Sequence, residues 1–407
     1  MDLQWEHMEQ PSQKRALNIV NSLREGVPPS DDVLLFSIGL EELIDYFARV
    51  LDDIAEFDLH GIKFIQADYG HGKTHFLDML AQLAFDRGFL VSMVTLDREQ
   101  APFNKLAKVV PLIMGGIMTG TGQQNALGRI LDQWAEKVRG IDGNAILRQI
   151  DQDEGLQLLF PDFRLKLVEY ARAHNQQDVP ASDECLRIEN WFRGAETKSK
   201  TFKNVPAFLA AFVQFARYVG YSGFVVMLDE AESITLLSRI TNRDQANENL
   251  RQIIDNQNLE SFYFVFASTP SFLSGEDDRG AQTYAALWRR IRDPFAQIQQ
   301  RALDKPIIEL PALDTDQFSQ LACRIRDIYK IAHGRNMSQV SDDHLQILAE
   351  YVERSTDRSV RTLVRSTVVL LDESRQAEDL DEDLDILSNY ELIVEHVKED
   401  EERRLAH

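Results

Sequence analysis

The residues best suited to chemistry lie in one glycine-bearing stretch, which reads IKFIQADYGHGKTHFL from Ile62 to Leu77. Glycines 70 and 72 let successive backbone N–H groups point inward around an anion, and the following helix adds the partial positive charge of its N-terminus. Lys73 can reach the β- and γ-phosphates of a nucleotide, and the Thr74 hydroxyl can hold magnesium. The sequence therefore predicts a P-loop for ATP and Mg²⁺, formed by Asp68, Tyr69, Gly70, His71, Gly72, Lys73, Thr74 and His75.

One residue departs from the usual pattern G-x-x-x-x-G-K-[ST], because Ala67 stands where the first glycine is normally found. Alanine adds a single methyl group, which the loop tolerates if this position has a negative φ. We therefore expect a functional loop. The alternative is a chance glycine turn in front of a helix.

A pair of acidic residues follows the apolar run FVVML from Phe224 to Leu228. Asp229, at the carboxyl end of a parallel strand, can hold the water shell of magnesium. The adjoining Glu230 is placed to orient and deprotonate the attacking water, so we expect it to be the catalytic base. Glu232 is a candidate for either task. An acidic pair of this kind, downstream of a P-loop, indicates ATP hydrolysis.

Two further groups are candidates for contact with the γ-phosphate. The strand FYFVFA ends in Ser268 and Thr269, and a hydroxyl at this strand tip would sense the phosphate; simple capping of the strand is the alternative. The helix YAALWRRIR carries Arg290, which could reach the γ-phosphate of a neighbouring subunit. Arg289 and Arg292 are close candidates, and a surface ion pair is the alternative.

A helical pattern near the C-terminus carries one more candidate cation. Arg361 lies near the start of this helix, where a positive group can reach back to the phosphates and couple the nucleotide state to a lid. An ordinary salt bridge is the alternative.

The elements that must position these residues read as an α/β core. Apolar runs predict parallel strands, and the residues between them follow helical spacing. The expected organisation is N-terminal helices packing on the core (1–60), a P-loop ATPase core (61–310) with a helical insertion at about 105–218, a helical lid (311–372) and an acidic C-terminal segment (373–407) with a terminal helix.

Charge and composition restrict the partners. The chain has 44 Lys and Arg against 66 Asp and Glu, a formal net charge of −22, which repels nucleic acid. We expect DNA contact to be indirect, through a partner protein. A local basic patch is the alternative, and a solvated loop is the plainer interpretation of that patch; its residues are Arg193, Lys198, Lys200 and Lys203, flanked by Trp191, Phe192 and Phe202.

The two cysteines, Cys185 and Cys323, have no metal or redox spacing, which favours a reducing compartment. No long apolar segment is evident, so we expect a cytoplasmic protein without membrane contact.

Several of these segments together resemble a known family. ALNIVNSLREGVPP, QADYGHGKTHFL, residues 191–194, VGYSGFVVMLDEAESI, SFYFVFASTPSFL and YAALWRRI occur in the order of the BrxC/BrxD-like ATP-binding family, AAA+-type P-loop ATPases named for the bacteriophage-exclusion (BREX) systems. The likeness covers most of residues 14–310. It implies a five-stranded parallel sheet, a helical lid, ATP and Mg²⁺ binding, and a role in prokaryotic antiviral defence beside proteins such as helicases or nucleases.

Three functions compete. The first is an ATPase that assembles with itself or with partners and uses turnover to load or regulate a DNA-processing effector. The second is a nucleotide-gated switch or scaffold with little turnover, favoured by Ala67 and the acidic charge. The third, a small-molecule kinase, lacks an evident acceptor pocket.

Overall fold

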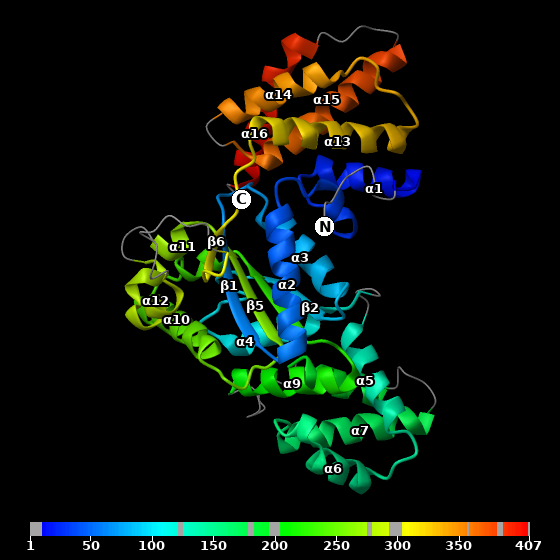
Figure 1. Ribbon diagram of the computed structural model, residues 1–407, viewed down its shortest axis with the longest axis vertical. Coiled ribbons are helices and arrows are strands. Elements are labelled where there is room, and N and C mark those ends of the chain that lie inside the picture. Colours follow the sequence, from blue (N-terminus) through cyan, green and yellow to red (C-terminus); the bar gives the residue numbers. More distant parts are fainter. Residues whose placement is uncertain are drawn as a thin grey trace. The chain divides into compact units, whose positions relative to one another are not determined.

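The computed structural model describes residues 10–120, 125–177, 183–194, 204–274, 279–292, 303–355, 358–380 and 386–405. The chain forms two compact units (Figure 1). The first unit comprises Met1–Asp45, Ala67–Leu80 and Glu309–His407, and the second comprises Tyr46–Gln66 and Ala81–Ile308.

The second unit is built on a six-stranded sheet with the order β3-β2-β4-β5-β1-β6. Its strands are β1 (His60–Gln66), β2 (Leu90–Thr95), β3 (Ile117–Met118), β4 (Phe224–Asp229), β5 (Phe262–Ser268) and β6 (Ile307–Glu309). Strand β5 pairs in parallel with both β1 and β4, and β4 pairs in parallel with β2. The carboxyl ends of these four strands therefore lie at one edge of the sheet.

The α/β architecture expected from the sequence is confirmed, with one correction to the sheet. All five expected strands are present, but β3 is a sixth strand, and it pairs antiparallel with β2 through Val91↔Met118 and Ser92↔Ile117. The sheet is therefore mixed. A strand of two residues is too short to show a period, and it directly follows the apolar helix α4 (Leu106–Gly115), whose pattern hides it.

Burial on both faces explains why the central strands read as continuous apolar runs. Every residue of β4 and β5 is buried. Aromatic rings pack across the strands; the centroids of Phe64 and Phe266 are 5.3 Å apart, and those of Phe264 and Phe266 are 5.2 Å apart.

The expected helical insertion is observed. After α4 it contains α5 (Ala126–Lys137), α6 (Gly143–Gln152), α7 (Pro161–Gln177), α8 (Asp183–Phe192) and α9 (Val205–Val219). Local signals fix two of the starts, because the side chain of Asn204 accepts from Ala207 N and that of Asp142 accepts from Asn144 N. The helices share an aromatic core in which the ring centroids of Phe163 and Phe192 are 5.0 Å apart.

This core bears on the candidate basic patch. Trp191 and Phe192 are buried among the insertion helices, so they cannot stack on nucleic-acid bases. Arg193 donates to Asn125 Oδ1 and to Glu189 Oε2. Lys198, Lys200, Phe202 and Lys203 lie outside the described residues.

The remaining described helices of the second unit follow the strands. Helix α2 (Glu41–Phe57) precedes β1, α3 (Lys73–Phe85) follows the phosphate loop, and α10 (Ile240–Ile254), α11 (Ser271–Ser274) and α12 (Ala285–Ile291) flank β5 in the sequence. Helices α2 and α3 each begin in the first unit and end in the second.

The first unit is a helical bundle of α1 (Gln13–Arg24), α13 (Thr315–His333), α14 (Asp342–Arg354), α15 (Val360–Leu380) and α16 (Ile386–Leu405). Helix α1 packs in one apolar cluster with α13 and α15, whereas the sequence analysis placed the N-terminal helices on the ATPase core. A charged contact joins the same helices, because Arg24 binds Asp372 through two hydrogen bonds of 2.9 Å. An amphipathic pattern shows that a face is buried without showing against what.

The acidic C-terminal segment contains the expected terminal helix, α16. Its residues Ile393, Val394 and Val397 are buried, so it is a packed part of the bundle. Within the described ranges, we find no helix with the length and apolar character needed to cross a membrane.

Candidate nucleotide-binding site

The phosphate loop leaves β1 after Gln66 and ends where α3 begins at Lys73. Gly70 and Gly72 have φ values of 77° and 85°, in the left-handed region that favours glycine. Ala67 is not among the described residues with positive φ, so its methyl group meets the condition set by the sequence. The backbone of this loop is therefore compatible with an anion-binding P-loop.

Two side chains of α3 show how the loop is held. Lys73 Nζ donates to the carbonyl oxygens of Ala67 and Asp68, at 2.9 and 3.0 Å, so its ammonium lies over the loop. The Nε2 atom of His75 lies 3.0 Å from Ser37 Oγ. Desolvation lowers the pKa of His75 to about 4, so the imidazole is neutral at pH 7.

The start of α15 contacts the phosphate loop within the first unit. Ser359, which is 3% exposed, donates through Oγ to the carbonyl oxygen of Gly70 at 3.4 Å, and the backbone N–H of Arg361 donates to the same oxygen at 3.2 Å. The Arg361 guanidinium lies 4.9 Å from the centre of the Tyr69 ring and donates to the Tyr69 hydroxyl. The structure thus brings Arg361 to the loop, as its position in the sequence suggested.

The acidic pair lies at the end of β4 in the second unit. Asp229 is 8% exposed, and its Oδ1 accepts the backbone N–H of Glu230 at 2.9 Å. Glu230 is exposed and has a φ of 54°. A left-handed glutamate is uncommon, and such strained residues concentrate at functional sites. The turn sends the chain from β4 directly into the 3₁₀ segment Ala231–Ile234.

Glu232 is a second acidic group in this turn. Its Oε2 atom is buried and has no hydrogen-bond partner in the part of the chain that the structure describes. A buried carboxylate oxygen without a partner is unfavourable when charged. Because Glu230 is exposed and Glu232 is not, Glu230 is the better candidate to face water.

Ser268 and Thr269 end β5, the strand between β4 and β1. Ser268 is fully buried, and its Oγ has no hydrogen-bond partner among the described residues. Thr269 Oγ1 lies 2.7 Å from Ser271 Oγ, at the start of α11. The contact of Thr269 agrees with capping, and a sensor role for either hydroxyl stays a prediction.

Arg290 forms an ion pair within its own chain. Its Nη2 atom donates to Asp255 Oδ2 at 2.6 Å, and its Nη1 atom donates to the carbonyl oxygen of Ala286 at 2.6 Å. Asp255 also accepts from Arg251, which in turn binds Glu248. This arrangement holds α12 to α10. The role of Arg290 in a neighbouring subunit is a prediction that a single chain does not test.

The predicted residues thus fall in two groups. The first unit brings Arg361 to the glycine loop, and the sheet of the second unit places the acidic pair and the Ser268–Thr269 pair at the ends of adjacent strands. Sequence analysis missed Ser359. A serine directly before a helical pattern is a known start signal, which could have drawn attention to this position.

A family model for the BREX system ATP-binding protein BrxC/D matches residues 12–388 of this chain. The chain belongs to this family. The resemblance noted in the sequence is therefore confirmed, and this BrxC/D family member is one of a group of ATP-binding proteins of the BREX system.

Three solved structures are similar to this BrxC/D family member at low identity. The Aeropyrum pernix ORC2 protein in ADPNP–ADP complexes is 15% identical, with a TM-score of 0.45, over 89% of this chain and 68% of that chain. The Aeropyrum pernix ORC1 protein in complex with DNA is 13% identical, with a TM-score of 0.40, over 93% and 69%. The Walker-type ATPase PABY2304 of Pyrococcus abyssi is 12% identical, with a TM-score of 0.36, over 90% and 76%. No curated protein matches the chain.

Proposed function

We propose that this chain is an ATPase of a prokaryotic antiviral defence system, in which ATP turnover loads or regulates a DNA-processing effector. The observation that carries the proposal is the phosphate loop, whose two left-handed glycines are followed directly by Lys73 and Thr74 at the start of α3. The family's description as an ATP-binding protein supports the choice of nucleotide.

The proposed roles follow the chemistry of each group. The backbone N–H groups of the loop and the ammonium of Lys73 bind the phosphates. The hydroxyl of Thr74 and the carboxylate of Asp229 are the magnesium ligands, because both are hard oxygen donors of the kind that Mg²⁺ prefers. Magnesium, when bound, neutralises charge on the phosphates. Glu230 takes the proton of the attacking water.

Three further residues complete the proposal. Thr269 acts as sensor of the γ-phosphate, Arg290 acts on the nucleotide of a neighbouring subunit, and Arg361 couples nucleotide binding to α15. These roles require assembly of the chain with itself. We also propose protein partners of helicase or nuclease type in the cytoplasm, with DNA contacted indirectly.

The test is phosphate release by the wild type, Lys73→Ala and Glu230→Gln, with Glu232→Gln as the matched control. We expect Lys73→Ala to lose ATP binding and turnover together, and Glu230→Gln to lose turnover while it still binds ATP. Glu232→Gln should retain most of its turnover. Equal phosphate release by all the preparations would show that another site is responsible.

A switch with little turnover is the second candidate, because the start of α15 already contacts the phosphate loop. A contact of this kind can report nucleotide binding without hydrolysis. ATP that stays bound through purification, with less than one turnover, would favour the switch. Sustained hydrolysis stimulated by a partner would favour the ATPase.

A further inference from the structure

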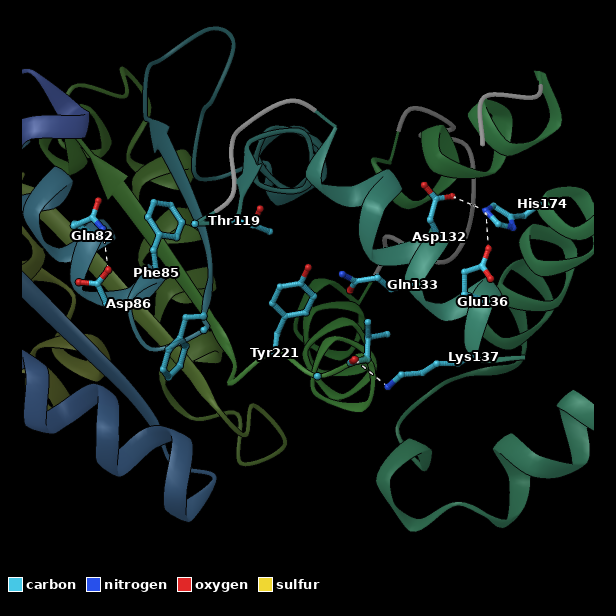
Figure 2. Close-up of a pocket in the computed structure, with 15 residues that line it drawn as sticks. Gln82, Phe85, Asp86, Thr119, Asp132, Gln133, Glu136, Lys137, His174 and Tyr221 are labelled. Carbon is cyan, nitrogen blue, oxygen red and sulfur yellow. Dashed lines mark hydrogen bonds and ion pairs between the residues drawn. The ribbon is translucent and has the colours of Figure 1, made fainter. Parts of the chain in front are cut away.

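A second pocket lies wholly within the second unit, and no residue assigned to the nucleotide lines it. Its volume is about 950 Å³, and its lining comes from the end of α3, the start of β2, the end of β3, α5, α7 and the end of α9 (Figure 2). This volume is at the upper end of the ~300–1,000 Å³ that is usual for small-molecule sites. The pocket is therefore large enough for an elongated organic ligand.

The lining carries an excess of negative charge. Three carboxylates line it, those of Asp86, Asp132 and Glu136, against one lysine and one histidine. The lysine, Lys137, donates to the carbonyl oxygens of Tyr218 and Val219 at 2.8 and 2.9 Å. These two hydrogen bonds draw its ammonium toward the end of α9. The histidine lies beside two of the acids. The field in the pocket therefore favours a cation.

One wall of the pocket is held in place by buried groups. The Nε2 atom of His174, a residue that is only 5% exposed, lies 3.4 Å from Asp132 Oδ1 and 4.0 Å from Glu136 Oε1. The hydroxyl of Tyr170 donates to Asp132 at 2.8 Å. Burial raises the pKa of Asp132, which shows that this carboxylate has lost part of its water. A cation that restores its electrostatic partner is bound more strongly than at an open surface.

The opposite wall carries a second carboxylate. Figure 2 shows Asp86 beside Gln82 on one side of the pocket, Asp132 with Glu136 on the other, and the Tyr221 ring between them. Gln82 Nε2 donates to Asp86 Oδ1 at 2.9 Å, which positions that carboxylate. Aromatic rings pack well against methylene groups and attract cations. The two charged ends of the pocket are thus joined by a less polar middle.

A metal ion does not account for this arrangement. Nowhere in the described part of the chain do three or more His, Cys, Asp or Glu side chains form a group that could hold a metal. A compact cation would also leave one of the two acidic walls without a partner. An elongated molecule with a cation at each end satisfies both.

We propose that this pocket binds a linear di- or polyamine, with one ammonium at Asp132 and Glu136 and a second at Asp86. The methylene chain lies along Tyr221 and Phe85. The net charge of −22 raises the concentration of cations near the protein and favours their capture.

The test is isothermal titration of the nucleotide-free full chain with spermidine, so that binding of the amine to ATP does not contribute. Asp132→Asn and Asp86→Asn each remove one charge without changing size. Glu154→Gln, at an exposed position of the same unit that does not line the pocket, is the control. Each lining variant should weaken spermidine binding about tenfold, since a charge-assisted hydrogen bond is lost. Glu154→Gln should bind spermidine like the wild type.

Three results would overturn the proposal. Equal weakening by Glu154→Gln would show diffuse attraction to an acidic surface. Butylamine bound as tightly as spermidine would remove the two-ended geometry. A lysine-rich peptide that binds at this pocket while spermidine does not would assign it to the side chain of a partner protein. Circular dichroism of each variant, together with retained ATP binding, shows that the fold is intact and separates this test from that of the ATPase.

Discussion

The guanidinium of Arg361 lies over the ring of Tyr69, 4.9 Å from its centre, and hydrogen-bonds to its hydroxyl across 292 residues of sequence. One residue further along the loop, the carbonyl oxygen of Gly70 accepts from Ser359 and from the backbone of Arg361. The start of α15 is therefore bound to the phosphate loop by both main-chain and side-chain contacts. The loop and this helix are expected to respond together when a nucleotide binds.

Substitution of Arg361 should separate this contact from nucleotide binding. If Arg361 reaches the phosphates, Arg361→Ala weakens ATP binding by about tenfold, which corresponds to roughly 1.4 kcal/mol. Tyr69→Phe keeps the ring but removes the hydroxyl that competes for the guanidinium, so ATP affinity should stay equal or increase. Fluorescence titration with a labelled ATP measures both.

The control is Arg354→Ala, which removes an exposed arginine of α14 that pairs with Glu350. It should leave ATP affinity unchanged. If Tyr69→Phe and Arg361→Ala weaken binding equally, the two side chains serve the loop only as a structural pair.

The two glycines of the loop should differ in their tolerance of alanine. Both have positive φ, so each substitution costs about 1–2 kcal/mol for the left-handed backbone. At Gly72 an added Cβ meets no atom within 4 Å, but at Gly70 it would clash with Ser359 Oγ. We expect Gly70→Ala to cost at least 1 kcal/mol more than Gly72→Ala, as overpacking does.

Urea unfolding of the two variants measures this difference. Adding Ser359→Ala removes the clashing oxygen, so the extra cost of Gly70→Ala should largely disappear in the double variant. A cost that persists there would show that backbone conformation alone determines the requirement for glycine at position 70.

Arg290 can be tested by complementation between subunits. If it acts in trans, Arg290→Ala and Lys73→Ala are each inactive alone, but a mixture forms some interfaces with an intact arginine and an intact loop, and phosphate release returns in part. Asp255→Asn, which removes the partner charge in the same chain, should leave turnover measurable. A mixture as inactive as its components would assign Arg290 to holding α12 on α10.

Acid should weaken the contact between α10 and α12. Glu248 accepts from two nitrogens of Arg251, at 2.7 and 2.6 Å, and from the Tyr284 hydroxyl at 2.9 Å. The hydrogen bonds from Arg251 contribute most to a pKa of Glu248 that is lowered to about 2. Because the folded-state pKa is below the unfolded one, this stabilisation is complete above about pH 4.5 and is lost as the pH falls toward 2.

The free energy of unfolding of the wild type should therefore fall more steeply with acid than that of Glu248→Gln, by up to about 1.4 kcal/mol per pH unit below pH 4.5. Urea unfolding between pH 5 and pH 3.5 measures both slopes. Glu154→Gln, at an exposed position, should keep the wild-type slope. Parallel slopes for wild type and Glu248→Gln would contradict the assigned stabilisation.

The sequence by itself determined the features that contiguous residues encode. The phosphate loop, the five long strands, the acidic pair after β4 and the insertion helices follow from turn chemistry, apolar runs and helical spacing, each of which acts over a few residues. The family was evident from the same segments. These local signals place candidate catalytic groups at strand ends without showing what surrounds them.

Only the tertiary structure decided which distant residues meet. Ser359 contacts Gly70 across 289 residues, α1 packs on α13 and α15, and β3 adds an antiparallel edge to β2. The acidic pocket likewise collects residues from 82 to 221. Such contacts depend on how buried faces of separate elements fit together, and the pattern of a single segment reports that a face is buried without naming the face that covers it.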